Sequence, residues 1–231
     1  MKKIYTIAFA GIDGSGKTTQ AQLLAVNLKK IFPNKRILYS WNRWSPFFLP
    51  LLLLRKMILR KNRGARRSYH IEKDSKKTLF KNRLFRVAWK TLFIIDYYFQ
   101  TLTRVKSRML FFDIAVIDRS YYDSFIDQAV NLGMDARTLA DFCNSRFIRN
   151  AFYHIELVFF IDTPEELAIM RTKETALGYL RDRKLYYKTL SREPHWITID
   201  GTQPMHVIEQ EIRGRVLRQY APGSTQEGEH R

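Results

Sequence analysis

Five short apolar runs along the chain indicate buried β-strands. One of them is followed directly by Gly11, and three end in an aspartate, Asp118, Asp162 or Asp200; glycine and aspartate commonly bound strands. The runs cover 3–10, 36–40, 113–118, 155–162 and 195–200. Between the runs, apolar residues fall three or four positions apart, a spacing typical of helices. Because strands and helices alternate, the chain predicts an α/β fold with three layers, in which helices cover both faces of a parallel five-stranded sheet.

The helical spacing predicts a series of helices between these strands. They occupy 17–32, 47–61, 76–110, 121–131, 135–150, 176–190 and 204–220. A further helix opens at Thr163-Pro164-Glu165-Glu166, which has the pattern of a capping box. The helix 76–110 would be about 50 Å long and would cross the whole domain. Residues 62–75 are polar and basic and predict a mobile loop, while 221–231 predict a disordered tail.

Composition is consistent with one globular domain of 1–220. The chain has 231 residues, of which 45% are apolar, enough for a substantial core. Its single cysteine, Cys143, excludes an intramolecular disulfide and favours a cytoplasmic location. The most apolar stretch, 47–59, is broken by Pro50, Arg55 and Lys56 and is too short to span a bilayer.

Positive charge is concentrated in the middle of the chain. The net charge is +18, and the segment 55–108 carries 17 Lys or Arg against three acids, 17 − 3 = +14. This predicts an acidic partner for the basic helical segment 47–110, either nucleic acid, an anionic membrane surface or an acidic polymer. A solvated basic helix face explains the charge equally well. The helix 76–110 has more apolar surface than one face can bury, which favours a homodimer.

A phosphate-binding motif lies between the first strand and the first helix. Gly11-Ile12-Asp13-Gly14-Ser15-Gly16-Lys17-Thr18 matches GxxxxGK[ST] in full. In such a loop the glycines let backbone N–H groups surround phosphate oxygens, and the helix N-terminus adds positive charge. We therefore expect ATP and Mg²⁺ as cofactors, with Lys17 on the β- and γ-phosphates and Thr18 on the metal. Asp13 would accept a hydrogen bond from an acceptor hydroxyl or hold a metal-bound water.

Other residues have the chemistry that phosphoryl transfer requires. Asp118 ends a strand, where it would orient the metal or act as a base. Arg119 would bind the acceptor or the transferred phosphate through its two-pronged guanidinium. The motif contains no arginine, so the charge of the transition state must be met from a lid at about 171–184. The candidates there are Arg171, Lys173, Arg181 and Arg183, and Arg171 and Arg181 are the two that we predict as catalytic.

These motifs, in this order, resemble the thymidylate kinase family. Residues 10–19, ending in Lys17-Thr18-Thr19, resemble that family's phosphate loop, including the aspartate. Asp118-Arg119-Ser120 resembles its DR motif, and Gln128 stands where the family has a glutamine. The resemblance spans residues 3 to about 213. It implies a P-loop NTPase fold with a long central helix and a helical lid, with nucleotide contacts from Gly11 through Thr19. It also implies a kinase that transfers phosphate from Mg·ATP to a nucleoside monophosphate.

The chain departs from the family at the acceptor site. The family's Arg-Glu-Pro-Gly-Gly-Thr loop is replaced by Trp41-Asn42-Arg43-Trp44-Ser45-Pro46, in which only Arg43 offers comparable charge. Where the family has Asp-Arg in the long helix, this chain has Asp96-Tyr97. The block 118–123 also resembles the Glu-Arg-Ser-x-Tyr block of deoxynucleoside kinases, which brings in Tyr122. The predicted acceptor-binding residues are therefore Asp13, Arg43, Asp96, Tyr97, Arg119, Tyr122 and Gln128.

Three functions remain open at this point. The first is a nucleoside monophosphate kinase, as the resemblance implies. The second is a P-loop kinase for another hydroxyl acceptor, such as a nucleoside, a sugar or a modified base in DNA, which the altered acceptor loop favours. The third is a nucleotide-dependent binding module for nucleic acid or membrane, which the apolar stretch 47–59 beside basic residues suggests.

Overall fold

The computed structural model describes residues 4–42, 45, 82–172 and 177–220. Several sequence predictions lie outside these residues. They are the helix 47–61, the loop 62–75, the tail 221–231, and the acceptor and lid candidates Arg43 and Lys173.

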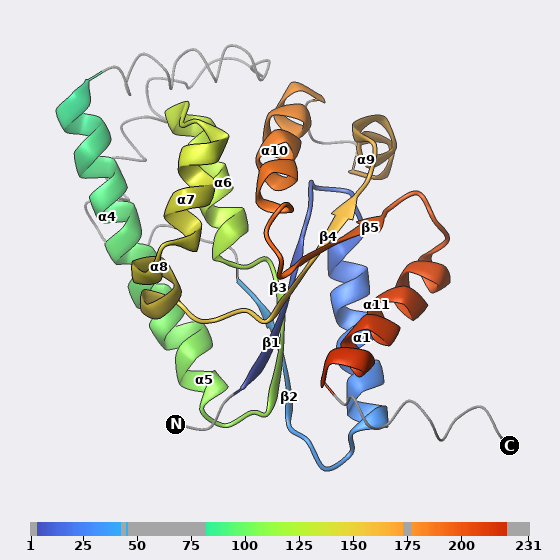
Figure 1. The fold of residues 1–231 in the computed structure, drawn as a ribbon. Helices are drawn as coiled ribbons and strands as arrows, with labels where there is room; N and C mark the ends of the chain where they lie inside the picture. Colours follow the sequence, from blue (N-terminus) through green and yellow to red (C-terminus); the bar gives the residue numbers. More distant parts are fainter. Residues whose placement is uncertain (1–3, 43–44, 46–81, 173–176, 221–231) are drawn as a thin grey trace, which may run out of the picture.

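A parallel five-stranded sheet forms the centre of the molecule (Figure 1). Its strands are β1 (Tyr5–Ala10), β2 (Ile37–Trp41), β3 (Ile114–Asp118), β4 (Leu157–Asp162) and β5 (Trp196–Asp200). Their order is β2-β3-β1-β4-β5, and every neighbouring pair is parallel. The prediction of fold class is therefore confirmed, with each strand boundary within two residues of the expected one. The carboxyl ends of the strands meet along one edge, which is where such sheets place their ligands.

Helices cover both faces of the sheet and complete three layers. On one face lie α1 (Lys17–Ile31) and α11 (Met205–Tyr220). The other face carries α4 (Arg83–Thr101), α6 (Tyr121–Leu132), α7 (Ala136–Asn144), α8 (Arg146–Ala151) and α10 (Leu177–Leu190), and α9 (Glu165–Thr172) follows β4. Side chains alternate across each strand, so Ile7 and Phe9 enter the core under α1 and α11, while Ala8 and Ala10 enter the other.

Two predicted helices differ in detail from the structure. The helix expected at 135–150 is two helices, because the extended backbone of Ser145 ends α7 and its hydroxyl caps α8 by accepting a hydrogen bond from the Ile148 N–H at 3.3 Å. The described part of the helix expected at 76–110 continues from α4 through a π-helical turn, η1 (Leu102–Lys106), into α5 (Ser107–Met109). No helix among the described residues is long and apolar enough to cross a membrane.

A cluster of aromatic rings fixes α4 and α6 against the sheet. The ring centroid of Phe125 lies 5.3 Å from that of Phe152, 5.8 Å from that of Phe93 and 5.9 Å from that of Tyr97. These near-perpendicular contacts place positive ring edges on negative ring faces, a geometry that adds to the burial of apolar area. The start of α6, which follows Asp118, is therefore held by packing.

Replacing the central ring should destabilise the fold. We expect Phe125→Ala to lower the free energy of unfolding by about 3–5 kcal/mol, because it leaves a cavity in a closely packed cluster. Phe147→Ala is the matched control, since Phe147 on α8 is 67% exposed and its loss should change stability by less than about 0.5 kcal/mol. Urea unfolding of both variants measures the difference, and equal effects would contradict the role assigned to the cluster.

Candidate active site

The predicted phosphate loop, 11–18, connects β1 to α1, and its glycines have the positive φ values that the motif predicts. Gly11, Gly14 and Gly16 have φ values of 148°, 88° and 90°, which residues other than glycine rarely adopt. A Cβ on Gly14 would lie 2.3 Å from the carbonyl oxygen of Ala168 in α9, so the loop packs directly on that helix. Around Gly16 a Cβ would meet no atom within 4 Å. The backbone at the start of α1 therefore faces open space that phosphate oxygens can enter.

Three cations surround the carboxylate of Asp13. Arg119 donates to it at 2.5 Å, Arg183 lies 3.3 Å away, and the ammonium of Lys17 lies 3.6 Å away. Burial alone would raise the pKa of Asp13, but the three cations outweigh it and hold that pKa well below its usual range. Burial and the neighbouring Arg119 lower the pKa of Lys17 to about 8, against the opposing effect of Asp13. Asp13 thus keeps three cations together at the end of the phosphate loop.

Arg183 is the most completely enclosed of these cations. It is 1% exposed, and its guanidinium lies 3.2 Å from Asp127 of α6 as well as 3.3 Å from Asp13. The ring centroids of Tyr179 and Tyr187 lie 5.4 and 5.6 Å from its guanidinium carbon, and it donates to the Tyr187 hydroxyl at 2.9 Å. Arg183 therefore connects α10, in the segment predicted as a lid, to both the phosphate loop and α6.

The other two lid arginines occupy different environments. Arg171, exposed on α9, donates to the carbonyl oxygen of Gly14 at 3.4 Å and so reaches the phosphate loop. Arg181 is 60% exposed and pairs with the exposed carboxylate of Glu166 at 3.3 Å. Of the two arginines predicted as catalytic, Arg171 reaches the loop and Arg181 does not. Arg183, the other arginine of α10 among the candidates, contacts the loop instead.

Asp118 and Arg119 occupy the end of β3, beside the loop. Asp118 is fully buried, its Oδ2 accepts a hydrogen bond from the Tyr39 hydroxyl at 3.1 Å, and its Oδ1 has no hydrogen-bond partner. An unpaired buried carboxylate oxygen is unusual and suits a ligand such as a metal-bound water. Arg119 has φ 66°, a left-handed conformation that is rare for residues with a side chain. Thr18 is exposed in the first turn of α1, open to a metal ion.

Asp123 of α6 is a buried acid that the sequence analysis left without a role. One of its oxygens accepts from the Ser120 N–H at 3.0 Å, completing a capping box, and the other accepts from the Tyr187 hydroxyl at 2.6 Å. Burial raises its pKa, against the charges of Lys17 and two arginines. The capping-box spacing Ser120-x-x-Asp123 was the signal in the sequence that could have identified it.

The predicted acceptor residues on α4 and α6 are engaged within the core. Tyr97 is fully buried and its hydroxyl accepts from the Asn42 side chain at 3.1 Å. Asp96 accepts from Gln100 at 2.7 Å. The Gln128 amide oxygen accepts from the indole N–H of Trp89 at 2.9 Å. Each of these three side chains therefore has a hydrogen-bond partner within the protein. The partners are Asn42, which follows β2, and Gln100 and Trp89 on α4.

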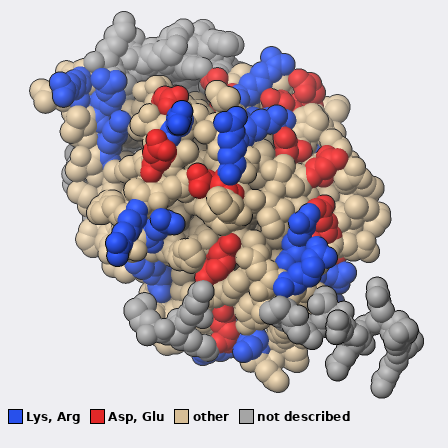
Figure 2. All heavy atoms as spheres, viewed as in Figure 1, with Lys and Arg blue, Asp and Glu red and all other residues tan. Residues whose placement is uncertain are grey.

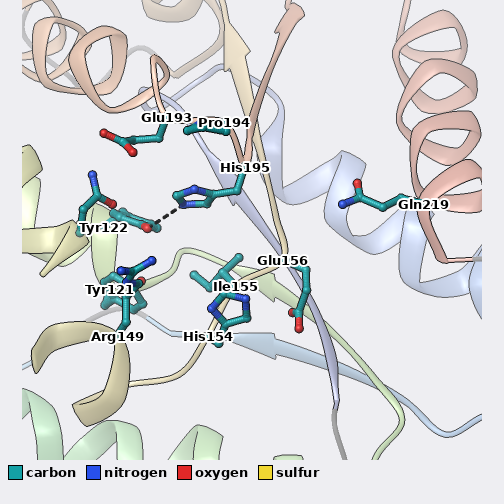
Figure 3. Close-up of a pocket in the computed structure, with 11 residues that line it drawn as sticks. Tyr121, Tyr122, Arg149, His154, Ile155, Glu156, Glu193, Pro194, His195 and Gln219 are labelled. Carbon is teal, nitrogen blue, oxygen red and sulfur yellow. Dashed lines mark hydrogen bonds between the residues drawn. The ribbon is translucent and has the colours of Figure 1, made fainter. Parts of the chain in front are cut away.

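Tyr122 lies in a separate pocket beside the residues that precede β4 and β5, at the amino ends of these strands (Figure 3). Its hydroxyl is 3.0 Å from Nε2 of His195, which precedes β5, whereas the phosphate loop follows β1. The pocket has a volume of about 500 Å³ and is also lined by Arg149, His154 and Glu193. The structure therefore does not bring Tyr122 to the phosphate loop.

Comparison with known proteins assigns the fold. No protein-family model matches the chain, and no curated protein sequence does. Among solved structures, the chain is similar to the thymidylate kinase of Ehrlichia chaffeensis, with 21% identity and a TM-score of 0.53 over 93% of this chain and 98% of that one. The chain has a P-loop NTPase fold of the α/β class. More narrowly, the fold is like that of thymidylate kinase, in divergent form.

Removing the enclosed arginine should destabilise the protein. We expect Arg183→Gln to lower the free energy of unfolding by about 3–5 kcal/mol, because it leaves Asp127 without this buried partner and removes one of the three cations around Asp13. Arg181→Gln is the matched control on the same helix, and the loss of its exposed ion pair should cost less than about 1 kcal/mol. Urea unfolding compares the two variants, and a similar loss of stability in both would contradict the role assigned to Arg183.

His195 should make stability depend on pH. Burial, with His154 and Arg149 nearby, lowers its pKa from 6.5 to about 4. Because the unfolded chain takes up the proton first, the contribution of this imidazole is present above pH 6.5 and is lost as the pH falls toward 4. Urea unfolding near neutral pH and at about pH 5 should show a smaller loss of stability on acidification for His195→Gln than for the unsubstituted protein. His206→Gln, at an exposed position on α11, should retain the original loss, and an unchanged loss in His195→Gln would disprove the assignment.

Proposed function

We propose that the protein is an ATP-dependent phosphotransferase, and that it transfers phosphate to a nucleoside monophosphate. The observation that supports this is the cluster of Lys17, Arg119 and Arg183 around Asp13 at the end of an intact phosphate loop. Three cations converge on one carboxylate at this loop, so they form a group that the oxygens of a bound polyanion could engage in place of that carboxylate. The thymidylate-kinase-like fold supports the same class of reaction.

The residues present fit ATP and Mg²⁺. When bound, ATP supplies the phosphoryl group, and Mg²⁺ neutralises charge on its phosphates. Lys17 and the open backbone at Gly16 would hold the phosphate oxygens. Thr18 and the unpaired Oδ1 of Asp118 would hold the metal or its water. The side-chain chemistry of this set, one hydroxyl and one carboxylate, is what Mg²⁺ takes in phosphate-handling sites.

Each remaining residue has a role that follows from its contacts. Asp13 is the acceptor-facing group, since its carboxylate can receive a hydrogen bond from the acceptor in place of one arginine. Arg119, fixed by its left-handed backbone and by Asp13, orients the acceptor or the transferred phosphate. Arg183 holds α10 over the loop. Arg171, exposed and already in contact with the Gly14 carbonyl, can turn toward the phosphates and meet the charge of the transition state.

A second candidate keeps the reaction and changes the acceptor. Tyr97 stands where the thymidylate kinase family, by resemblance, has an arginine that would clamp an acceptor phosphate. Here the residue is a buried tyrosine whose hydroxyl accepts a hydrogen bond from Asn42. An acceptor without a phosphate of its own, such as a nucleoside, a sugar or a modified base in DNA, does not need a cation there. This observation favours a hydroxyl acceptor as the alternative to a nucleoside monophosphate.

Turnover against a panel of acceptors tests both proposals. ATP consumption with Mg²⁺ is measured with the deoxynucleoside monophosphates, nucleosides, several sugars and DNA. We expect a monophosphate to react, and we expect Lys17→Ala to lower that rate by about 100-fold or more, because it removes a cation from the transferred phosphate. Lys30→Ala, at an exposed position in the last turn of α1, is the control and should keep the full rate.

The outcomes separate the candidates. Turnover with a nucleoside, sugar or DNA and none with monophosphates would replace the first acceptor with the second. ATP binding without turnover on any acceptor would contradict phosphotransfer and leave a nucleotide-dependent binding module. Equal rates for the Lys17→Ala and Lys30→Ala variants would show that the activity does not use the phosphate loop.

A further inference from the structure

The cavity beside the amino ends of β4 and β5 has a volume of about 500 Å³ (Figure 3). Its walls come from the start of α6, the ends of α7 and α11, the short helix α8, and the residues that precede the two strands. Cavities of this size hold small-molecule ligands. We call it the β4–β5 pocket. It contains no residue of the phosphate loop 11–18, and the proposed phosphotransfer gives it no role.

An arginine and two histidines line the β4–β5 pocket. Arg149 lies on α8, His154 precedes β4 and His195 precedes β5. The helix α8 contains two arginines and no acid, and Figure 2 shows Lys and Arg side chains gathered over it, at the left of the molecule. Arg149 is exposed and forms no ion pair with any acid among the described residues. Its guanidinium can therefore bind an anion without breaking an existing pair.

These three groups are close enough to affect one another. Burial lowers the pKa of His195 to about 4, and His154 and Arg149 add to this effect. An anion bound among the three would relieve their mutual repulsion. The Tyr122 hydroxyl lies 3.0 Å from Nε2 of His195. With this hydroxyl donating to Nε2, the neutral imidazole carries its proton at Nδ1 and can donate it to a ligand.

The two acids that line the pocket do not neutralise its arginine. The Oε2 of Glu156 accepts a hydrogen bond from the Thr6 N–H at 2.8 Å. In Figure 3, Glu193 and Arg149 lie on opposite sides of Tyr122. The side of the pocket formed by Arg149 therefore remains able to receive an anion.

A buried acceptor atom also belongs to the pocket wall. The Oδ1 of Asn144, the last residue of α7, is buried and has no hydrogen-bond partner among the described residues. Buried polar atoms almost always have a partner, so a lone acceptor beside a cavity indicates a ligand that donates to it. Hydroxyl and amino groups donate in this way, whereas an ionised phosphate or carboxylate only accepts. The ligand would therefore have an organic part in addition to its anionic group.

We propose that the β4–β5 pocket binds a small phosphate ester, either a sugar phosphate or a nucleoside monophosphate. The donors of Arg149, His154 and His195 come from three separate segments, and a tetrahedral phosphate can accept from all three through different oxygens. A carboxylate has only two oxygens in one plane, which suit a single arginine. A hydroxyl or amino group of the organic part then donates to Asn144 Oδ1.

Nuclear magnetic resonance of the histidine side chains distinguishes binding at this pocket from binding at the phosphate loop. The C2–H resonances of His154 and His195 are assigned from their Gln variants. His206 reports on the phosphate loop, because it follows Met205, which lines a cleft with Ser15 and Gly16. The probes are glucose 6-phosphate, thymidine monophosphate, inorganic phosphate and citrate.

We expect a phosphate ester to shift the resonances of both pocket histidines. Inorganic phosphate should bind about tenfold more weakly or less, because it lacks the group that donates to Asn144. Citrate, which has carboxylates alone, should not shift the resonances. The ester that binds more tightly identifies whether the pocket takes a sugar phosphate or a nucleotide.

Substitutions on α8 and α7 test the two halves of the ligand separately. Arg149→Gln should weaken ester binding by about tenfold or more, because it removes charge-assisted hydrogen bonds to the phosphate. Arg146→Gln is the matched control, at an exposed position on the same helix and outside the pocket. Asn144→Leu should weaken binding of the ester and leave binding of inorganic phosphate unchanged. The same resonances measure each affinity, and thermal unfolding checks that each variant is folded.

Binding at this pocket does not depend on the proposed phosphotransfer. Lys17→Ala should lose turnover and keep the shifts of His154 and His195, so failure of either proposal is recognised separately. The pocket proposal is overturned if neither ester shifts these resonances, if citrate or inorganic phosphate binds as tightly as the esters, or if Arg149→Gln and Arg146→Gln bind alike. A shift of the His206 resonance alone would place the binding at the phosphate loop and would also overturn it.

Discussion

The carboxylate of Asp13 is the contact on which the candidate site depends. Lys17 and Arg183 are almost fully buried, and buried cations persist only when anions compensate them. Around the loop, three cations face three acids. The cations are Lys17, Arg119 and Arg183, and the acids are Asp13, Asp123 and Asp127. The arrangement is therefore stable without a ligand, and an incoming phosphate must compete with Asp13 for its cations. Competition of this kind makes binding sensitive to how many charges the ligand carries.

Two helices position this cluster through simple periodicity. On α6, Asp123 and Asp127 are four residues apart and so lie on one side of the helix. On α10, Tyr179, Arg183 and Tyr187 repeat at the same interval and form a matching stripe. The acids of α6 face the tyrosines and the arginine of α10 and bond to them, so these contacts hold α10 and α6 together. A displacement of α10 would move Arg183 away from both acids.

The sequence was most informative where a signal was local. Glycine-rich spacing located the phosphate loop, and apolar runs located all five strands, because both patterns depend on neighbouring residues. The neighbouring sequence does not decide whether Arg181 or Arg183 faces the loop. Residues two apart lie on opposite sides of a helix, and either side could have packed against the loop. Tyrosines four residues before and after Arg183 mark the buried side. The position of Tyr122 could not be predicted for a similar reason, because the direction of its side chain depends on packing against His195 and Trp196, which are distant in sequence.

Charge at the acceptor position connects the cluster to specificity. Burial raises the pKa of the Tyr97 phenol, so the hydroxyl stays neutral and cannot offset a phosphate. An acceptor phosphate would then draw on Arg119, whose partner is Asp13, and the two anions would compete for one guanidinium. A hydroxyl acceptor would instead donate to Asp13 and leave Arg119 in place. If the proposed function holds, the Arg119–Asp13 ion pair would decide between the two acceptor classes, because it would have to open for an acceptor phosphate and could stay closed for a hydroxyl acceptor.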